Sequence, residues 1–123
     1  MNSPSDTLLL GTANSDGTFT GVTAAATTSQ AIPPQQHQTA CLVVIGNGTL
    51  STGVLTIEEA LWTDKQMPYS GTWSAITTVT ASTLTGGAQQ VIHLAPTALT
   101  YIRVRISTGV TGGGGLSVIL RYL

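Results

Sequence analysis

Residues 101–121 read YIRVRISTGVTGGGGLSVILR and decide the fold class. Apolar and polar side chains alternate on both sides of a glycine run, which indicates two half-buried β-strands. We expect a hairpin in which Val104 lies opposite Val118, since that register places the other apolar residues of both strands on one inner face. These residues are Ile102, Ile106, Leu116 and Leu120. The outer face then carries Tyr101, Arg103, Arg105, Ser117 and Arg121.

Six further segments have strand character and are separated by turn sequences rich in Gly, Asn and Ser. They span 7–10, 18–23, 40–45, 54–62, 72–81 and 89–95, and the terminal pair spans 99–107 and 116–123. No segment shows sustained helical periodicity. About eight antiparallel strands predict one all-β domain, residues 1–123, folded as a jelly-roll-like β-sandwich. The polar segment 29–38 contains adjacent prolines and should be an extended N-terminal crossover or an arm that reaches a neighbour.

Charged residues make up only 7% of the 123 residues, against about 25% in a typical soluble domain. A small domain usually stays apart from its copies through a charged surface. Here neutral polar side chains must take that place, and they lose water at a lower cost than Lys or Glu. The only lysine, Lys65, cannot protect several open strand edges, so we expect a closed homo-oligomer. Nucleic acid is not expected as a partner, because it calls for a basic excess.

The N-terminal residues and the single cysteine give no sign of secretion, of a disulfide framework or of a multi-cysteine metal site. Residues 1–6 lack the pattern of a secretion signal, and no apolar run is long enough to span a bilayer. We expect a protein made and used without secretion and without a membrane partner. Cys41 opens an apolar run and should be a buried, inert thiol.

Residues that usually carry catalysis or bind metals are few and scattered. Glu58 and Glu59 are consecutive on a predicted strand and should point to opposite faces, so they cannot share a cleft. His37 and His93 have no second ligand at metal-binding spacing. The run Gly112–Gly115 lacks the lysine and the helix start of a phosphate-binding loop. We therefore predict a non-enzymatic protein with no catalytic residue, no metal site and no cofactor.

Two groups of residues are candidates for binding. Three aromatic residues bracket a polar loop that contains Asp64, and they could stack on sugar rings or anchor a protein contact; they are Trp62, Tyr69 and Trp73. The competing interpretation is that one or both tryptophans fill the core. The second group is Arg103 and Arg105, about 7 Å apart on one strand face, with Tyr101 and Arg121 expected beside them across the hairpin. It fits a solvated face, a protein contact or an anionic ligand.

Four strings of residues carry a resemblance to a known class of proteins: TWSAI at 72–76, GGAQQ at 86–90, YIRVR at 101–105 and TGGG at 111–114. They resemble small virion proteins of tailed bacteriophages, in particular capsid decoration or cement proteins. The resemblance implies a β-sandwich that assembles in the host cytoplasm, often as a homotrimer, on the capsid surface. There it would brace neighbouring subunits of the major capsid protein. The alternative is a carbohydrate-binding or host-adhesive module of a phage tail that uses the aromatic group.

Overall fold

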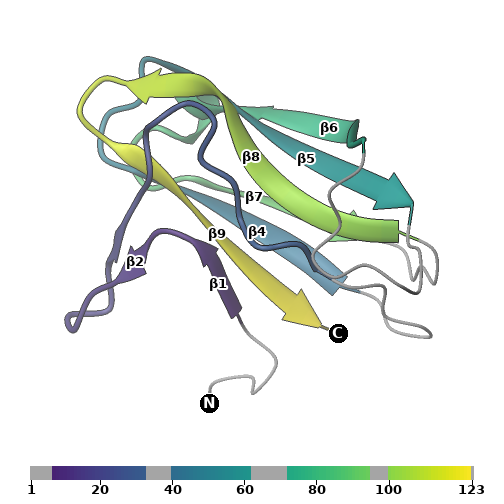
Figure 1. Ribbon diagram of the computed structural model, residues 1–123. Helices are drawn as coiled ribbons and strands as arrows, with labels where there is room; N and C mark the ends of the chain where they lie inside the picture. Colours follow the sequence, from purple (N-terminus) through teal and green to yellow (C-terminus); the bar gives the residue numbers. More distant parts are fainter. Residues whose placement is uncertain (1–6, 33–39, 62–71, 95–99, 123) are drawn as a thin grey trace.

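The computed structural model describes residues 7–32, 40–61, 72–94 and 100–122, and these form antiparallel strands and one 3-10 turn (Figure 1). The elements are β1 Thr7–Leu10, β2 Thr12–Ala13, β3 Phe19–Thr20, β4 Ala40–Asn47, β5 Thr52–Leu61, β6 Ser74–Thr80, η1 Ala81–Leu84, β7 Gln89–Leu94, β8 Thr100–Thr111 and β9 Gly115–Tyr122. No helix in the described residues has the length and apolar character needed to cross a membrane.

Two sheets face each other and form the body of the molecule. One has the strand order β1-β9-β4-β7, and the other has the order β6-β5-β8. A two-stranded ribbon of β2 and β3 projects from the first sheet (Figure 1). Val22 bridges Leu116 of β9, and residues 23–32 then run along the outer edge of β8, where isolated bridges join Thr28 to Arg105 and Ile32 to Ile102. Counting this edge segment gives two four-membered layers, so the predicted jelly-roll-like β-sandwich is confirmed.

The space between the sheets is filled by side chains from every main strand. Leu42, Val44, Leu55, Ile57 and Val104 are fully buried there. The alternation seen in residues 101–121 therefore places the side chains as predicted: Ile102, Val104, Ile106, Leu116, Val118 and Leu120 all belong to the core. Cys41 is also buried, as expected.

The predicted pairing of residues 102–106 with 116–120 as a hairpin is wrong. β8 pairs with β5, with Val104 opposite Ile57, whereas β9 pairs with β4, with Val118 opposite Val44. The two strands lie in different sheets and meet across the core. The physical reason is that a period of two determines which face of a strand is buried, but not which strand becomes its neighbour.

The glycine run makes this change of sheet possible. A Cβ atom at Gly114 would overlap the backbone oxygen of Asn47, and one at Gly21 would overlap the backbone of Gly115. Backbones can approach this closely only where side chains are missing. The run is thus a tight connection between the layers, and the prediction that it is the loop of a hairpin is wrong.

The predicted arm at 29–38 lies partly within the described residues. Ser29 and Ile32 donate backbone hydrogen bonds to Val104 and Ile102 at 2.9 and 2.7 Å, so residues 29–32 are attached to the β8 edge of their own chain. Residues 33–38, with both prolines, lie outside the described part of the structure.

Candidate functional site

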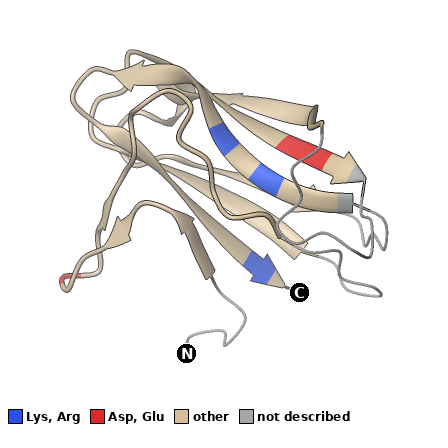
Figure 2. Cartoon of the chain, viewed as in Figure 1, with Lys and Arg blue, Asp and Glu red and all other residues tan. Residues whose placement is uncertain are grey.

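The outer face of the β6-β5-β8 sheet carries half of the charged residues that the structure describes, namely Glu58, Arg103 and Arg105. The register of β5 and β8 sets Glu58 opposite Arg103 and Thr56 opposite Arg105. These residues alternate with the core residues Ile57 and Val104, so they point away from the core. Figure 2 shows two blue segments on β8 beside a red segment on β5, and a separate blue segment on β9.

Arg103 is fixed on two sides. Its Nε–H donates to Oε1 of Glu58 at 2.7 Å, and its guanidinium carbon lies 4.2 Å from the centre of the Trp73 ring. The side chains of Arg103 and Glu58 are only 25% and 11% exposed. A charge-assisted hydrogen bond and a cation–π contact act together here, so the guanidinium has a defined position and its charge is compensated.

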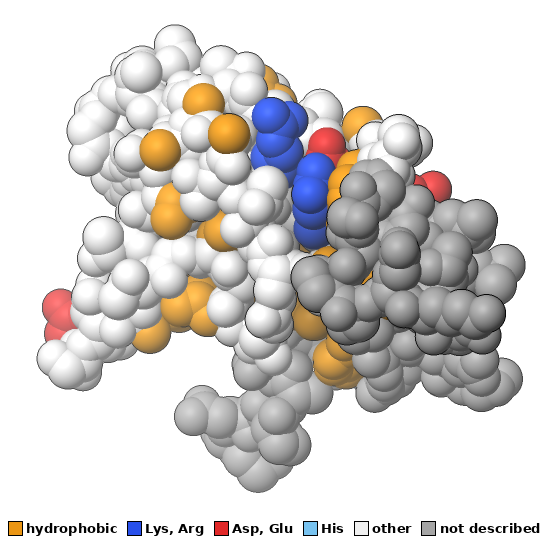
Figure 3. Space-filling view, viewed as in Figure 1, with side chains coloured by type: hydrophobic (Ala, Val, Ile, Leu, Met, Phe, Trp, Pro, Cys, Tyr) orange, Lys and Arg blue, Asp and Glu red, His pale blue; other side chains and the backbone are white. Residues whose placement is uncertain are grey.

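Arg105 lies two residues further along the same face and is partly buried. Within the described parts of the chain, no carboxylate lies within ion-pair distance of it. Its cross-strand neighbour on β5, Thr56, shares a hydrogen bond with the hydroxyl of Ser107 at 2.7 Å. Figure 3 shows the blue arginine atoms side by side on this face. The N–H groups of Arg105 can therefore be used by a partner.

The four-residue group predicted around these arginines is divided by the fold. Tyr101 lies on the same outer face of β8, but it is only 1% exposed. It is therefore covered by other residues and offers no surface to a partner. Arg121 lies on β9, opposite Cys41, and belongs to the other sheet. The expected proximity of Tyr101 and Arg121 is wrong, because it depended on the hairpin.

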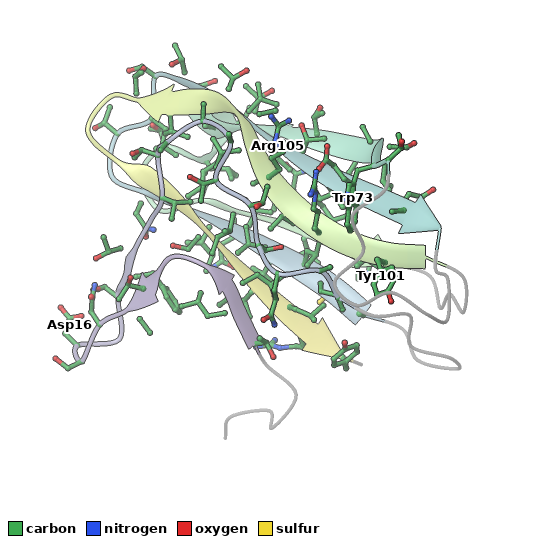
Figure 4. All side chains as sticks on the ribbon, in the orientation of Figure 1. Asp16, Trp73, Tyr101 and Arg105 are labelled. Atoms are coloured by element: carbon green, nitrogen blue, oxygen red, sulfur yellow. The ribbon has the colours of Figure 1, made fainter. Side chains whose placement is uncertain are left out.

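Of the predicted aromatic group, only Trp73 lies among the described residues. This residue precedes β6 and is partly buried, with its ring against Arg103. Figure 4 shows Arg105, Trp73 and Tyr101 spread along β8. The other members, Trp62, Tyr69 and Asp64, lie outside the described residues.

The described acidic residues lie apart or face opposite sides of a strand. Glu58 and Glu59 face opposite sides of β5, opposite Arg103 and Ile102, as predicted. Asp16 accepts hydrogen bonds from the hydroxyl and the backbone N–H of Thr18 at 2.6 and 3.0 Å, and these bonds lower the pKa of its carboxyl group. Among the described residues, no three His, Cys, Asp or Glu side chains gather in a way that could hold a metal ion.

One hollow in the surface lies beside the glycine run. It has a volume of about 340 Å³ and is lined by Phe19, Thr20, Asn47 and neighbouring glycines. No charged side chain lines it. Gly21, Gly114 and Gly115 are explained by the close approach of backbones and Gly113 by its positive φ, so the hollow follows from the packing of the loops.

Sequence reasoning found both arginines but missed Glu58 as the partner of Arg103. The only signal for it was the opposite charge of two strand residues, which is useful only once the strands are known to be neighbours. No protein-family model, curated protein or solved structure matches this chain at a significant level.

Proposed function

We propose that the protein is a non-enzymatic structural protein of a bacteriophage virion, a decoration or cement protein that binds the major capsid protein on the capsid surface. The observation that carries the proposal is the pair of arginines on the outer sheet face. Arg103 has its charge compensated by Glu58, while the guanidinium of Arg105 lies beside it without an acidic partner among the described residues. A rigid sheet that presents one uncompensated cation is suited to binding a protein surface.

Beyond Glu58, Arg103 and Arg105, the described residues include only three charged side chains, those of Asp16, Glu59 and Arg121, and this supports permanent contact. Residues 74–94, which form β6, η1 and β7, include no Lys, Arg, Asp or Glu. Among the described strands, β6 and β7 each pair on one side only and leave backbone groups at their other edge. Such an edge invites contact with another chain unless it is protected. A brace between subunits must give up water from its surface, and neutral polar side chains do so at a lower free-energy cost than charged ones.

The partner group for Arg105 is a carboxylate on the capsid subunit. An arginine forms two parallel hydrogen bonds with a carboxylate, which fixes orientation as well as position. The fixed Arg103 guanidinium next to it adds positive potential without moving. This contact would determine how the protein sits on the shell.

Cosedimentation with capsid shells assembled without this protein tests the proposal. Arg105→Ala should weaken association about tenfold or more, as expected for an arginine at the centre of a contact. The matched control is Arg121→Ala, which removes the same charge from the other sheet and should leave association unchanged. Equal binding by wild type and Arg105→Ala would overturn the role given to this face. Failure of the wild-type protein to bind any shell would overturn the proposed function itself.

The resemblance to cement proteins further suggests a homotrimer, and light scattering at micromolar concentration measures this directly. A glycan-binding role for the aromatic group is less favoured, because one face of Trp73 is engaged by Arg103. Glycan-array binding that disappears in Trp73→Ala would reverse that preference.

A further inference from the structure

The outer face of the four-stranded sheet carries a continuous row of aliphatic side chains. Leu8 on β1 lies opposite Ile119 on β9, and Ile119 lies opposite Val43 on β4. Val43 in turn lies opposite Val91 on β7. The row, here called the aliphatic stripe, therefore crosses all four strands at one level of the sheet.

The stripe is separate from the core. The residues next to it along the strands, Leu42 and Val44 on β4 and Val118 and Leu120 on β9, point between the sheets and are at most 4% exposed. The stripe residues point the other way. Leu8, Val43 and Ile119 are partly exposed, and Val91 is 49% exposed.

Such a face is unusual for an antiparallel sandwich, whose outer side is normally polar. β4 contains the run Cys41–Ile45, which is apolar on both faces, as in a strand that is covered on both sides. Ile45 lies opposite Ser117 and Gln89 and extends the apolar area beyond the stripe. Within the described part of this face, Arg121 is the only residue with a full charge, and it lies at the margin.

We propose that the aliphatic stripe is the contact between copies of this chain. A second copy brings a surface of the same neutral chemistry, so no uncompensated charge has to lose its water. A partner with an ordinary charged surface would not match the stripe. The stripe also ends at Val91, on the open edge strand β7, where backbone groups remain for an adjacent chain.

The part of this face that is open to a second copy is smaller than the sheet itself. Four strands at the usual spacing and the eight residues of β9 give a face about 20 Å wide and about 26 Å long. Its end at Ser117, which is 0% exposed, is already covered by Gly11 of the same chain, so a second copy would cover the remaining part around the aliphatic stripe. Arg103 and Arg105 lie on the opposite sheet, so both contacts can form at once.

Sedimentation velocity on wild type and two matched variants tests the proposal. Val91→Lys and Ile76→Lys each place a charge on an exposed aliphatic position, 49% and 42% exposed, in different sheets. We expect the wild type to be oligomeric at micromolar concentration. Val91→Lys should raise the dissociation constant about tenfold or more, whereas Ile76→Lys should leave it unchanged. Circular dichroism confirms that each variant is folded.

If Val91→Lys does not fold, the double variant Val43→Thr with Ile119→Thr replaces it, since threonine keeps the branched shape but adds a hydroxyl. A monomeric wild type would overturn the second copy as occupant and leave the stripe to a different protein. An oligomer that withstands both stripe variants, or that weakens equally in Ile76→Lys, would also overturn the proposal. This self-contact rests on the proposed role of the protein in an assembly. Its failure can be told apart from failure of the proposed function, because shell binding is tested through Arg105 on the other sheet.

Discussion

Arg103 donates from Nε to Oε1 of Glu58 at 2.7 Å across two neighbouring strands, and both side chains are largely removed from water. The bond joins β8 to β5 on the outer face of the sheet and compensates both charges. Arg105, two residues away, has no such acidic partner among the described residues. Arg103 and Arg105 therefore have different roles although they are chemically alike and close together on β8. Arg103 belongs to the fold, and Arg105 belongs to the surface.

Removing the guanidinium of Arg103 should destabilise the protein more than removing that of Arg105. Arg103→Ala leaves Glu58 as a largely buried carboxylate without its partner, which should lower the free energy of unfolding by about 1–3 kcal/mol. Arg105→Ala breaks no ion pair and should change it by about 0.5 kcal/mol or less. Urea denaturation of both variants measures the difference. Equal losses would mean that the ion pair adds nothing to stability.

Replacing Val104 by Asp should prevent folding. Val104 is fully buried between the sheets, and a carboxylate there has no partner. The cost of burying that charge exceeds the total stability of a typical domain. Circular dichroism and thermal melting report the result, with Thr108→Asp, at an exposed position of the same strand, as the control. A Val104→Asp protein with a native spectrum and an unchanged melting temperature would contradict the assigned inner face.

Gly46 should not tolerate alanine, although Gly109 should. A Cβ atom at Gly46 would overlap the backbone oxygen of Leu84, which cannot move without displacing η1. At Gly109 the nearest atom to a new Cβ is 3.7 Å away, an ordinary contact. We expect Gly46→Ala to cost about 1–3 kcal/mol, as overpacking does, and Gly109→Ala to cost much less. Melting temperatures of the two variants check this, and a stable Gly46→Ala protein would show that η1 packs differently.

Stability should fall in alkaline solution because of Tyr122. Partial burial raises the pKa of its hydroxyl above the ordinary value of 10.0. Below pH 10 the group is protonated in both the folded and the unfolded chain, so its contribution is fully present. As the pH rises further, the unfolded chain ionises first and stability is lost. Tyr122→Phe should show a smaller loss between neutral and strongly alkaline pH in urea denaturation. Identical pH profiles for the two proteins would exclude this contribution.

Much of the fold was predictable because strand signals are local. The segments predicted at 7–10, 40–45 and 89–95 coincide closely with β1, β4 and β7. The segment 18–23 was only partly correct, since β3 covers Phe19–Thr20 and the chain then leaves the ribbon to follow β8. That path depends on hydrogen bonds with a strand 80 or so positions away in the chain, a non-local contact that no local pattern encodes.

The sequence by itself determined on which face of its strand each side chain lies, because successive residues of a strand point to opposite faces whatever strand lies beside them. It thereby identified the core residues of 102–106 and 116–120 and the outward direction of Arg103 and Arg105. It did not determine that the outward Tyr101 and Ser117 are also buried, at 1% and 0% exposed. Only the tertiary structure decided which strands are neighbours, since pairing depends on how two complete sheets fill one core. Glu58 therefore became the partner of Arg103, Arg121 moved to the other sheet, and Leu8, Ile119, Val43 and Val91 came into a single row.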